Sequence, residues 1–571
     1  MATTRLEERL LASLGKLQAA PIRFEAVSDV PKGGVLCAVP ALLALGLLRH
    51  SQEKFALPAG YYPLETIFLS IALLALARVS SLEQLRYEPP GEWGKLLGLD
   101  RIPEVRTLRE KLEMLCANPP SVREWSGQLA QEWMAAEPDS AGTLYIDGHV
   151  RVYHGTLTAL PRRYVARQRL CLRGTTDYWV NAMDGQPFFV VSQAADPGLV
   201  RVLEEQLIPR LLKEVPGQPS AAALEADPRR ARFTLIFDRA GYSPEFFARQ
   251  WAQRIAVITY HKFPGNDWPA DEFTRRRVRL ANGEVSELAL AERGTRLSND
   301  LWVREVRQRE DSGHQTAIVA TDYQRELSGV AVAMFARWCQ ENFFQYMGQH
   351  YGLDRLIEYG TEPLPETTLV VNPAWRRKDQ AVRRERALLV RQQAQLGALS
   401  LPVAASPEAV AAYEAQQGQL LAQIQAREQQ LELLKAERKA LSQHLTLKEL
   451  PEAERFHQLR ATRKHFVDTI RLIAYRAETA LVALVREKLA RSDDARSLIR
   501  QVFQSAVDLY PDPAAHTLTV RLHRLTSAAH DAALQHLCAE LTETETVYPG
   551  TDLRLIFEPV GASQIPRDQE S

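Results

Sequence analysis

The amino-acid sequence predicts a multi-domain α/β protein, and three patterns lead to this fold class. Residues 143 to 155, TLYIDGHVRVYHG, alternate apolar and polar side chains, which indicates a β-strand with one buried face. Before this strand, apolar residues such as Ile67, Ile71 and Leu74 recur at helical spacing. Residues 420 to 445 carry the 4-3 repeat of a short coiled coil. At 571 residues the chain has room for two to four domains.

Residues 1 to 140 have a mostly helical pattern and are predicted to form a separate helical domain. From 141 to 375 the pattern changes to strands and helices, which predicts the central α/β domain. Strand candidates and turn signals fill residues 259 to 313, which we interpret as a β-rich insertion into that domain. A further helix is expected from about residue 322 to residue 352.

Two local signals sharpen the prediction for the central domain. Asp184 and Gly185 favour a tight turn between two apolar runs, as in a β-hairpin. The buried strand FTLIFD ends at Asp238, and a helix is expected soon after it, with Ser243 as the N-cap and Pro244 as the first helical residue.

Residues 376 to 450 are predicted to form a helical hairpin or coiled coil. An Arg-rich helix comes first, and GALSLPVAASPE separates it from the residues that follow the 4-3 spacing. Two arginines interrupt this otherwise apolar seam, which consists of Leu420, Ile424, Arg427, Leu431, Leu434, Arg438, Leu441 and Leu445. Residues 451 to 571 combine a long helix from about 453 to 492 with alternating strands around a helix, which predicts a small α/β C-terminal module.

Composition and charge disfavour some classes of protein. Hydrophobic residues make up 46% of the chain and charged residues 25%, which is typical of soluble globular proteins. Lys plus Arg and Asp plus Glu number 70 each, so the chain has no formal net charge. This balance disfavours a histone-like binder and leaves open a localised site for a polyanion.

The cysteines and the apolar runs indicate the compartment. Five scattered cysteines, without a CxxC pair, suit a reducing cytosol and disfavour a disulfide framework or a structural zinc site. The N-terminus lacks a signal-peptide core. Apolar runs at 35 to 48 and 67 to 77 are shorter than the roughly 18 to 20 residues of a membrane-spanning helix. We therefore expect buried core helices in a cytoplasmic protein that has no membrane partner.

Three carboxylates occupy unexpected positions. Asp147 lies midway along the strand at 143 to 155, and Asp238 ends a strand that is apolar on both faces. Acidic side chains at the carboxyl ends of such strands lie where α/β sheets bind ligands. Glu341 continues a helical stripe through Met334 and Trp338, so we expect it to face inward, where a carboxylate needs a partner.

Each carboxylate also has an ordinary explanation. Asp147 alone could be a strand-edge or turn residue, and Asp238 alone could begin a turn, where Asp is favoured. Glu341 could form a surface ion pair with Arg337, four residues earlier, which is worth only a few tenths of a kcal/mol. Only the combination of the three acids points to a shared site.

Three converging carboxylates repel one another unless a cation neutralises them. Ligation by oxygen alone suits Mg²⁺ or Mn²⁺. Two such ions, roughly 3.5–4 Å apart, would clamp a phosphodiester for in-line displacement by water or a 3′-hydroxyl. Asp147, Asp238 and Glu341 are therefore the candidate catalytic and metal-binding residues, and the chemistry is the cutting and joining of phosphodiesters.

At these residues the chain resembles a known family. TLYIDGHVRVYHG, LIFDRAGYSPEFF and RWCQENFFQYMGQHYGLD are similar to the three catalytic blocks of the DDE transposases of bacterial insertion sequences. The resemblance covers about residues 65 to 352 and is strongest for the branch with a Tyr-x2-Arg-x3-Glu-x6-Lys signature and a β-rich insertion. It implies a ribonuclease-H-like core in which the three acids hold the metals.

The chain departs from that signature at two positions. Arg337 matches the signature arginine, which in the family contacts DNA, but Met334 stands at the tyrosine position and Gly348 at the lysine position. The groups that are missing here contact the DNA backbone near the cut end in that branch. Contacts to the terminal phosphate must therefore come from other residues.

An arginine cluster close to Asp147 is the main candidate for binding DNA. The stretch LPRRYVARQRLCLRG interleaves an aromatic residue with arginines that suit phosphate contacts, namely Arg162, Arg163, Arg167, Arg169 and Arg173. A solvated amphipathic strand pair is the alternative interpretation. Two further Arg-rich stretches, TRRRVR at 274 to 279 and WRRKDQAVRRER at 375 to 386, are additional candidates.

These observations predict a metal-dependent transposase of the bacterial cytoplasm that binds the ends of its element, cleaves them and joins them to target DNA. The helical residues 1 to 140 are expected to bind the end sequences, and the coiled coil to form a homodimer that holds two ends. Two alternatives remain open at this point. One is a ribonuclease-H-like nuclease without strand transfer, and the other is a catalytically inactive, domesticated DNA-binding protein.

Overall fold

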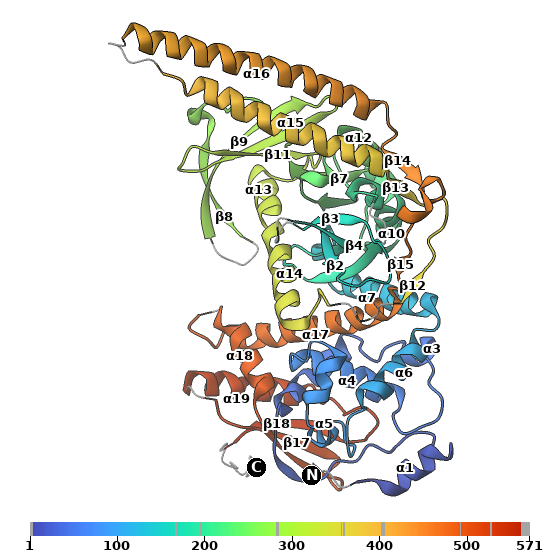
Figure 1. The fold of residues 1–571 in the computed structure, drawn as a ribbon. Coiled ribbons are helices and arrows are strands. Elements are labelled where there is room, and N and C mark those ends of the chain that lie inside the picture. Colours follow the sequence, from blue (N-terminus) through green and yellow to red (C-terminus); the bar gives the residue numbers. More distant parts are fainter. Residues whose placement is uncertain are drawn as a thin grey trace.

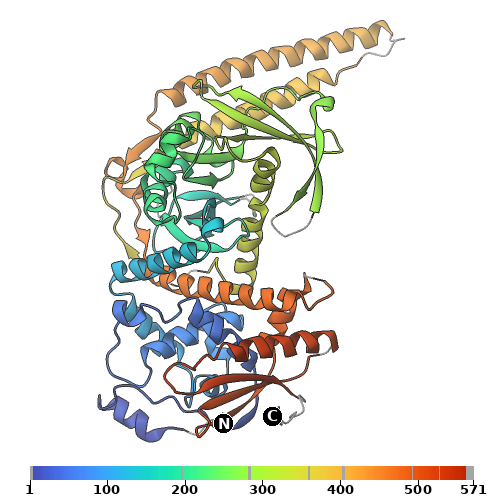
Figure 2. The same cartoon turned by 180° about the vertical axis from the view of Figure 1, so that it is seen from behind.

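The computed structural model describes residues 4–165, 168, 170–193, 197–280, 285–355, 357, 360–400, 406–491, 493–525 and 528–560. The two ends of the chain lie together at the bottom of the molecule, the central segment forms a large sheet above them, and two long helices project at the top (Figure 1). The reverse view shows the same three levels (Figure 2).

A ten-stranded sheet forms the centre of the molecule, in the order β3-β4-β2-β6-β7-β11-β10-β9-β8, with β5 paired to β4. β2 is antiparallel to β4 and parallel to β6, which is parallel to β7. The strands on this side are β2 (Thr143–Val152), β3 (Arg162–Val165), β4 (Leu170–Asn181), β5 (Pro187–Gln193), β6 (Phe233–Ile236) and β7 (Ile255–Tyr260).

The β-rich stretch that we expected as an insertion extends this same sheet. β11 pairs antiparallel with β7, and each further strand pairs with the previous one. These strands are β8 (Thr274–Arg279), β9 (Val285–Arg296), β10 (Trp302–Arg309) and β11 (Gln315–Ala320). The shape of the sheet is visible in the green part of Figure 1.

The first strand is more buried than its alternating pattern predicts. Leu144, Tyr145 and Ile146 are all buried, so both faces of β2 are covered at its start. Arg151, which the alternation places on the polar face, is also buried, because it pairs with Asp177 of β4. An ion pair therefore replaces water on that face.

Helices connect and cover the strands of the sheet. The prediction for α12 is confirmed, since Ser243 caps it by accepting a hydrogen bond from the backbone N–H of Phe246 at 3.3 Å, and Pro244 is the first helical residue. The helices between β5 and β7 are α9 (Leu199–Val202), α10 (Ile208–Glu214), α11 (Ala221–Ala226) and α12 (Pro244–Ala252).

The helix expected from residue 322 to residue 352 is broken into two. α13 (Leu327–Phe335) ends and α14 (Arg337–Tyr351) begins on either side of Ala336. Residues before Leu327 form a turn, in which the Asp322 carboxylate accepts hydrogen bonds from the backbone N–H groups of Gln324 and Arg325. Gly352 ends α14 with φ +65°, a conformation that favours glycine.

The predicted helical hairpin is present and forms a projecting arm. α15 (Pro373–Gly397) and α16 (Pro407–Lys439) pack along each other around a small apolar core of Val382, Leu389, Ile424 and Leu431. The two arginines of the seam point inward to acids on α15, with Arg427 pairing with Glu385 and Arg438 with Asp379. At the base of the arm, β13 (Leu369–Val371) pairs with β14 (His444–Thr446), and nearby β12 (Thr361–Glu362) pairs with β15 (Gln458–Leu459).

The N-terminal and C-terminal segments, expected as separate units, share one sheet and one core. β1 (Val27–Val30) pairs with β16 (Val507–Asp512), which continues to β17 (Thr517–Leu522) and β18 (Arg554–Pro559). α17 (Thr462–Arg486) crosses the molecule (Figure 1) and packs against three helices of the N-terminal segment, which are α2 (Val39–Ala44), α4 (Leu64–Leu76) and α7 (Pro119–Ala136). No local sequence pattern predicts that the N-terminal and C-terminal segments associate, because their contacts join residues more than 400 positions apart.

The remaining helices of this lower level are mostly short. The apolar run at 67 to 77 is buried as predicted and lies almost entirely in α4, where every residue except Glu65 is buried. The run at 35 to 48 forms a short 3₁₀ helix followed by α2, and it is buried at its start but exposed at Ala44. The helices are α1 (Leu6–Ser13), α2 (Val39–Ala44), α3 (Ser51–Lys54), α4 (Leu64–Leu76), α5 (Pro90–Leu96), α6 (Val105–Leu115), α7 (Pro119–Ala136), α8 (Pro138–Ala141), α18 (Asp494–Gln504) and α19 (Ala528–Glu543). Among the described residues, none of the helices combines the length and the apolar character needed to cross a bilayer.

Candidate active site

Asp147 and Asp238 occupy equivalent positions on neighbouring parallel strands. The register of β2 against β6 pairs Tyr145 with Ile236, and each aspartate follows two residues after its member of that pair. Neighbouring strands in a sheet lie about 4.8 Å apart, so the register brings the two acids to adjacent places at the carboxyl end of β6. This juxtaposition comes from pairing between segments 91 residues apart.

The backbone around each aspartate holds its carboxylate. Asp147 Oδ1 accepts a hydrogen bond from the backbone N–H of Gly148 at 2.8 Å. Gly148 also makes room in the sheet, because a Cβ there would lie only 3.0 Å from the Tyr178 ring. Asp238 Oδ1 accepts from the backbone N–H of Ala240 at 2.9 Å, so this residue does begin a short 3₁₀ turn, as its alternative interpretation proposed.

Arg337 links Asp147 to Glu341. It is the first residue of α14, and its Nη1 donates to Asp147 Oδ2 at 3.1 Å. Its Nη2 donates to Glu341 Oε1, so the surface-type pair between these two residues is also present. The side chain is only 15% exposed, and its Nε is buried without a hydrogen-bond partner among the described residues. Arg337 thus faces the carboxylates and retains one unused donor.

Glu341 does not face inward, contrary to the expectation from the helical stripe. Its side chain is 56% exposed, and Trp338 on the same stripe is also exposed. The stripe was extrapolated from residues of α13, where Met334 is fully buried. Because the helix breaks at Ala336, the rotational phase of α13 does not carry over to α14. Glu341 is therefore an exposed carboxylate whose partner is Arg337, four residues earlier on the same helix.

The three acids nevertheless act on one another electrostatically. Burial is the largest cause of the raised pKa of Asp147, which rises from 3.8 to about 6. The Arg337 guanidinium lowers this pKa, while the negative charges of Asp238 and Glu341 raise it further. Conversely, these three carboxylates raise the pKa of Arg337, although burial opposes its charge. We refer to Asp147, Asp238, Glu341 and Arg337 as the acidic site.

The donor chemistry of the acidic site fits a divalent cation. The three carboxylates offer only oxygen atoms, which Mg²⁺ and Mn²⁺ prefer, and their mutual repulsion favours binding of a cation. The acids are not drawn into a tight cluster, however, because the arginine lies between Asp147 and Glu341. Within the described part of the chain, only one group of three ligand-type side chains has its atoms within 4.8 Å of one another, and it lies elsewhere.

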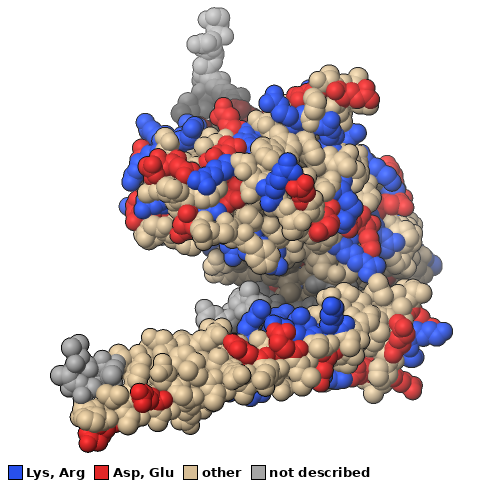
Figure 3. Space-filling model, turned by 90° about the horizontal axis from the view of Figure 1, so that it is seen from above, with Lys and Arg blue, Asp and Glu red and all other residues tan. Residues whose placement is uncertain are grey.

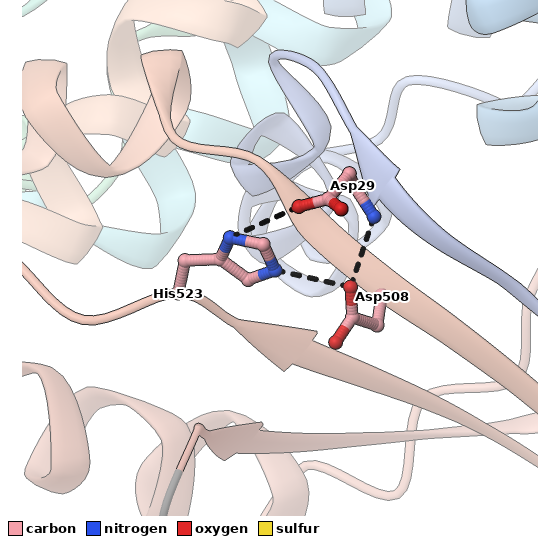
Figure 4. A group of neighbouring side chains, drawn as sticks. All are labelled: Asp29, Asp508 and His523. Carbon is pink, nitrogen blue, oxygen red and sulfur yellow. Dashed lines mark hydrogen bonds and ion pairs between the residues drawn. The ribbon is translucent and has the colours of Figure 1, made fainter.

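That group consists of Asp29, Asp508 and His523 and joins β1 to the C-terminal sheet (Figure 4). Asp508 Oδ1 lies 3.0 Å from His523 Nε2 and accepts a hydrogen bond from the backbone N–H of Asp29, also at 3.0 Å. His523 Nδ1 lies 3.7 Å from Asp29 Oδ1. Each ring nitrogen therefore faces a carboxylate. No pattern in the sequence indicates this group, because its members come from segments far apart in the chain.

The predicted arginine cluster is only partly described. Arg162 of β3 lies directly opposite Arg173 of β4, and both side chains are exposed. Arg163 lies opposite Leu172 in the same strand pair, while Arg167 and Arg169 lie outside the described residues. Like charges directly opposite each other are unfavourable in a sheet unless an anion lies between or beside them. The strand pair of the alternative interpretation is therefore present, and it carries facing arginines.

Two polar residues outside the predicted site, Gln340 and His149, hold α14 on the sheet. The buried Gln340 donates from Nε2 to the carbonyls of Tyr145 and Trp179, at 3.3 and 3.2 Å, and to Asn181 Oδ1 at 2.8 Å. His149 stacks on Phe344 and pairs through Nε2 with Asp354 at 2.5 Å. Neither role leaves a trace in the sequence, because a buried polar residue on a helix is recognisable only from its partners.

Fold and site together define a multi-domain α/β protein that gathers carboxylates and an arginine on its central sheet. A protein family described as "Transposase protein" matches residues 1–561. The chain therefore belongs to this transposase family, and its function lies in DNA transposition.

The solved structures that match part of the chain include a transposase complex with DNA. It is titled "Cryo-EM structure of piggyBac transposase synaptic complex with hairpin DNA", with a TM-score of 0.30 and 11% sequence identity. The similarity covers 57% of this chain and 69% of that chain. Among curated proteins, no match was found.

Proposed function

We propose that the protein is a DDE transposase that cleaves the ends of its element and joins them to target DNA, with Asp147, Asp238 and Glu341 as catalytic residues. One observation carries this proposal, which is that three acids from distant segments of the chain influence one another. The register of β2 and β6 aligns Asp147 with Asp238, and the negative charge of Glu341 contributes to the raised pKa of Asp147. The match to a transposase family over residues 1–561 supports the reaction class.

The strand arrangement supports a ribonuclease-H-like core. β5, β4 and β2 form an antiparallel set, and β6 and β7 continue the sheet parallel to β2. In this proposal the core uses its central strand and the adjacent parallel strand to carry the first two acids. The helix after the last strand then brings Glu341.

Two Mg²⁺ or Mn²⁺ ions, when bound, would activate the attacking water or 3′-hydroxyl and stabilise the departing oxygen. Asp147, Asp238 and Glu341 would hold these ions through their carboxylate oxygens. Arg337 neutralises part of the negative charge of the site through its pairs with Asp147 and Glu341, which weakens the repulsion that a phosphate group would meet there. In this proposal it therefore contributes to DNA binding beside the reacting bond.

The DNA partners would be the ends of the element and the target duplex. Arg162 and Arg173, with Arg163, Arg167 and Arg169 of the same stretch, would contact phosphates, which would relieve the repulsion of the facing arginines. We propose that residues 1 to 140 bind the end sequence. We also propose that the arm of α15 and α16 contributes to a homodimer, because two ends must be held together.

The proposal is tested with DNA duplexes that carry the sequences flanking the reading frame. Asp147→Asn and Asp238→Asn should each lower Mg²⁺-dependent cleavage of these ends at least about a hundredfold, since each removes one charged ligand. Asp311→Asn, at a side chain that is 99% exposed, is the matched control and should cleave as the wild type does. Cleavage by Asp238→Asn at the wild-type rate would refute the catalytic assignment.

The same assay separates the alternatives. Products in which the cleaved 3′ end is joined to a second duplex identify a transposase, whereas cut ends alone identify a hydrolase. Absence of cleavage in the wild type with both Mg²⁺ and Mn²⁺, despite binding to the ends, identifies a DNA-binding protein without turnover.

A further inference from the structure

The exposed face of α15 carries only positive charge. The helix contains seven basic residues and two acidic ones, Asp379 and Glu385. Both acids are turned toward α16, where Asp379 pairs with Arg438 at 2.7 Å and Glu385 with Arg427 at 2.5 Å. Lys378 also faces α16 and pairs with Glu437. The packing of the arm thus removes the acids of α15 from the solvent-facing side and leaves the arginines there.

These arginines lie on one side of the helix. At 100° per residue, five of them fall in a sector of roughly 120° that is opposite the buried Val382 and Leu389. All five are exposed, and they are Arg376, Arg377, Arg383, Arg384 and Arg391. We call this set the arginine face. A solvated helix usually mixes charges of both signs, so a face of one sign calls for an explanation.

Three members of the arginine face have no acidic partner in the described part of the chain. Arg377 lies 3.7 Å from Glu454, and Arg383 pairs with Asp379 one turn earlier. Arg376, Arg384 and Arg391 form no ion pair with any residue that the structure describes. The first and last of these cations are 15 positions apart, or about 22 Å along the helix, which matches the length of roughly six phosphates along one strand of a duplex.

The arginine face continues from the predicted arginine cluster. A pocket of about 400 Å³ at the base of the arm is lined by Arg162 and Arg173 of the central sheet and by Arg376 of α15. Seen from above, Lys and Arg side chains gather toward the base of the arm, whereas its outer half carries few charges (Figure 3). In the sequence, residues 392 to 426 contain only two charged side chains, Glu408 and Glu414.

We propose that the arginine face of α15 binds the phosphate backbone of double-stranded DNA without regard to sequence, as a continuation of the surface formed by Arg162 and Arg173. This inference rests on the proposed function for the identity of its partner, but it does not depend on catalysis. Exposed arginines in a row contact phosphates and carry no information about bases, so the face extends the length of duplex that the protein holds.

The test is the salt dependence of binding to a short duplex without element sequences, measured by fluorescence anisotropy on the full-length protein. The triple variant Arg376→Gln, Arg384→Gln and Arg391→Gln should reduce the slope of log K against log salt by about 2.7, from roughly 0.9 per lost phosphate contact. The matching triple substitution to Lys should retain the slope, because point charges suffice for phosphates.

A charge-matched control removes three other exposed arginines, Arg249, Arg296 and Arg554, whose side chains are 54%, 65% and 45% exposed. Their replacement by Gln should leave the slope near the wild-type value. An equal loss of slope in both triple variants, or no loss in the α15 variant, would overturn the proposal. So would a change in sedimentation of the α15 variant with unchanged DNA binding, because the face would then contact a second copy of the chain.

The two proposals can fail separately. Wild-type cleavage by Asp238→Asn with a reduced salt slope in the α15 variant would refute the catalytic assignment alone. Loss of cleavage by Asp238→Asn with an unchanged slope in the α15 variant would refute the arginine face alone.

Discussion

Arg151 and Asp177 show how a single pair of residues can turn a polar strand face into an interior. Arg151 Nη2 donates to Asp177 Oδ1 at 2.9 Å, and the Ser192 hydroxyl donates to the same oxygen at 2.6 Å. Both charged side chains are at most 4% exposed. Burial opposes the ionisation of Asp177, but the Arg151 guanidinium and these hydrogen bonds outweigh it and hold its pKa below 3.8.

Because the pKa of Asp177 is lowered on folding, its contribution to stability is present above pH 3.8 and is lost as the pH falls below that value. Asp177→Asn should destabilise the protein by about 3–5 kcal/mol at neutral pH, since Arg151 is left buried without a counter-charge. Thermal unfolding measured from pH 7 down to pH 2 should show a shallower acid decline for this variant than for the wild type. Asp311→Asn, at an exposed carboxylate, should follow the wild-type curve.

The candidate site at this scale was only partly predictable. Asp147 and Asp238 stood out because acids at these places on apolar strands are unusual, and the alignment of their strands then places them side by side. The predicted inward orientation of Glu341 was wrong, because no residue type near Ala336 indicates the break between α13 and α14. The sequence predicted only the local pair of Arg337 with Glu341. The second partner of Arg337, Asp147, lies 190 residues away in the chain.

At the scale of elements, the arm of α15 and α16 is held by a thin core. Val382, Leu389, Ile424 and Leu431 form its buried cluster, with Leu396 and Leu434 partly buried beside them. Three ion pairs flank this core on the two helices. Because so few buried side chains stabilise the arm, the loss of any one of them should lower its stability noticeably.

Leu389→Ala should destabilise the arm by about 2–4 kcal/mol, because it removes a buried side chain from a small cluster. Hydrogen exchange of the amides in residues 373 to 439 should speed up, while exchange in the central sheet should not change. The neighbouring Val390→Ala is the control, since Val390 is 58% exposed and its loss leaves no cavity. Equal effects of the two substitutions would contradict this account of the arm.

At the scale of the whole molecule, Glu478 joins three distant parts of the chain. Its carboxylate is fully buried and pairs with Arg78 of the N-terminal segment at 2.8 Å. It also accepts hydrogen bonds from Tyr346 and Tyr351 of α14, and Arg496 of the C-terminal segment lies 3.7 Å away. One carboxylate of α17 therefore ties the central domain to both ends of the chain.

Glu478→Ala should destabilise the protein by about 3–5 kcal/mol, because it leaves the partly buried Arg78 and Arg496 without the acid that both of them face. Since the contact spans three segments, differential scanning calorimetry should show the main transition split or broadened, with the sheet melting apart from the terminal segments. Glu487→Ala, an exposed residue at the end of the same helix, should leave a single transition. A split transition in the control would refute this role of Glu478.

The sequence by itself determined much of the local secondary structure of this protein. The cap of α12 by Ser243, the buried helix α4, the helical hairpin and the strand around Asp147 follow from residue type and spacing, because neighbours a few positions apart decide them. Only the tertiary structure decided the rest: β1 completing a sheet of the C-terminal segment, the burial of Arg151, and the outward direction of Glu341. Those features depend on partners hundreds of residues away, whose approach is set by packing and leaves no periodic trace in the chain.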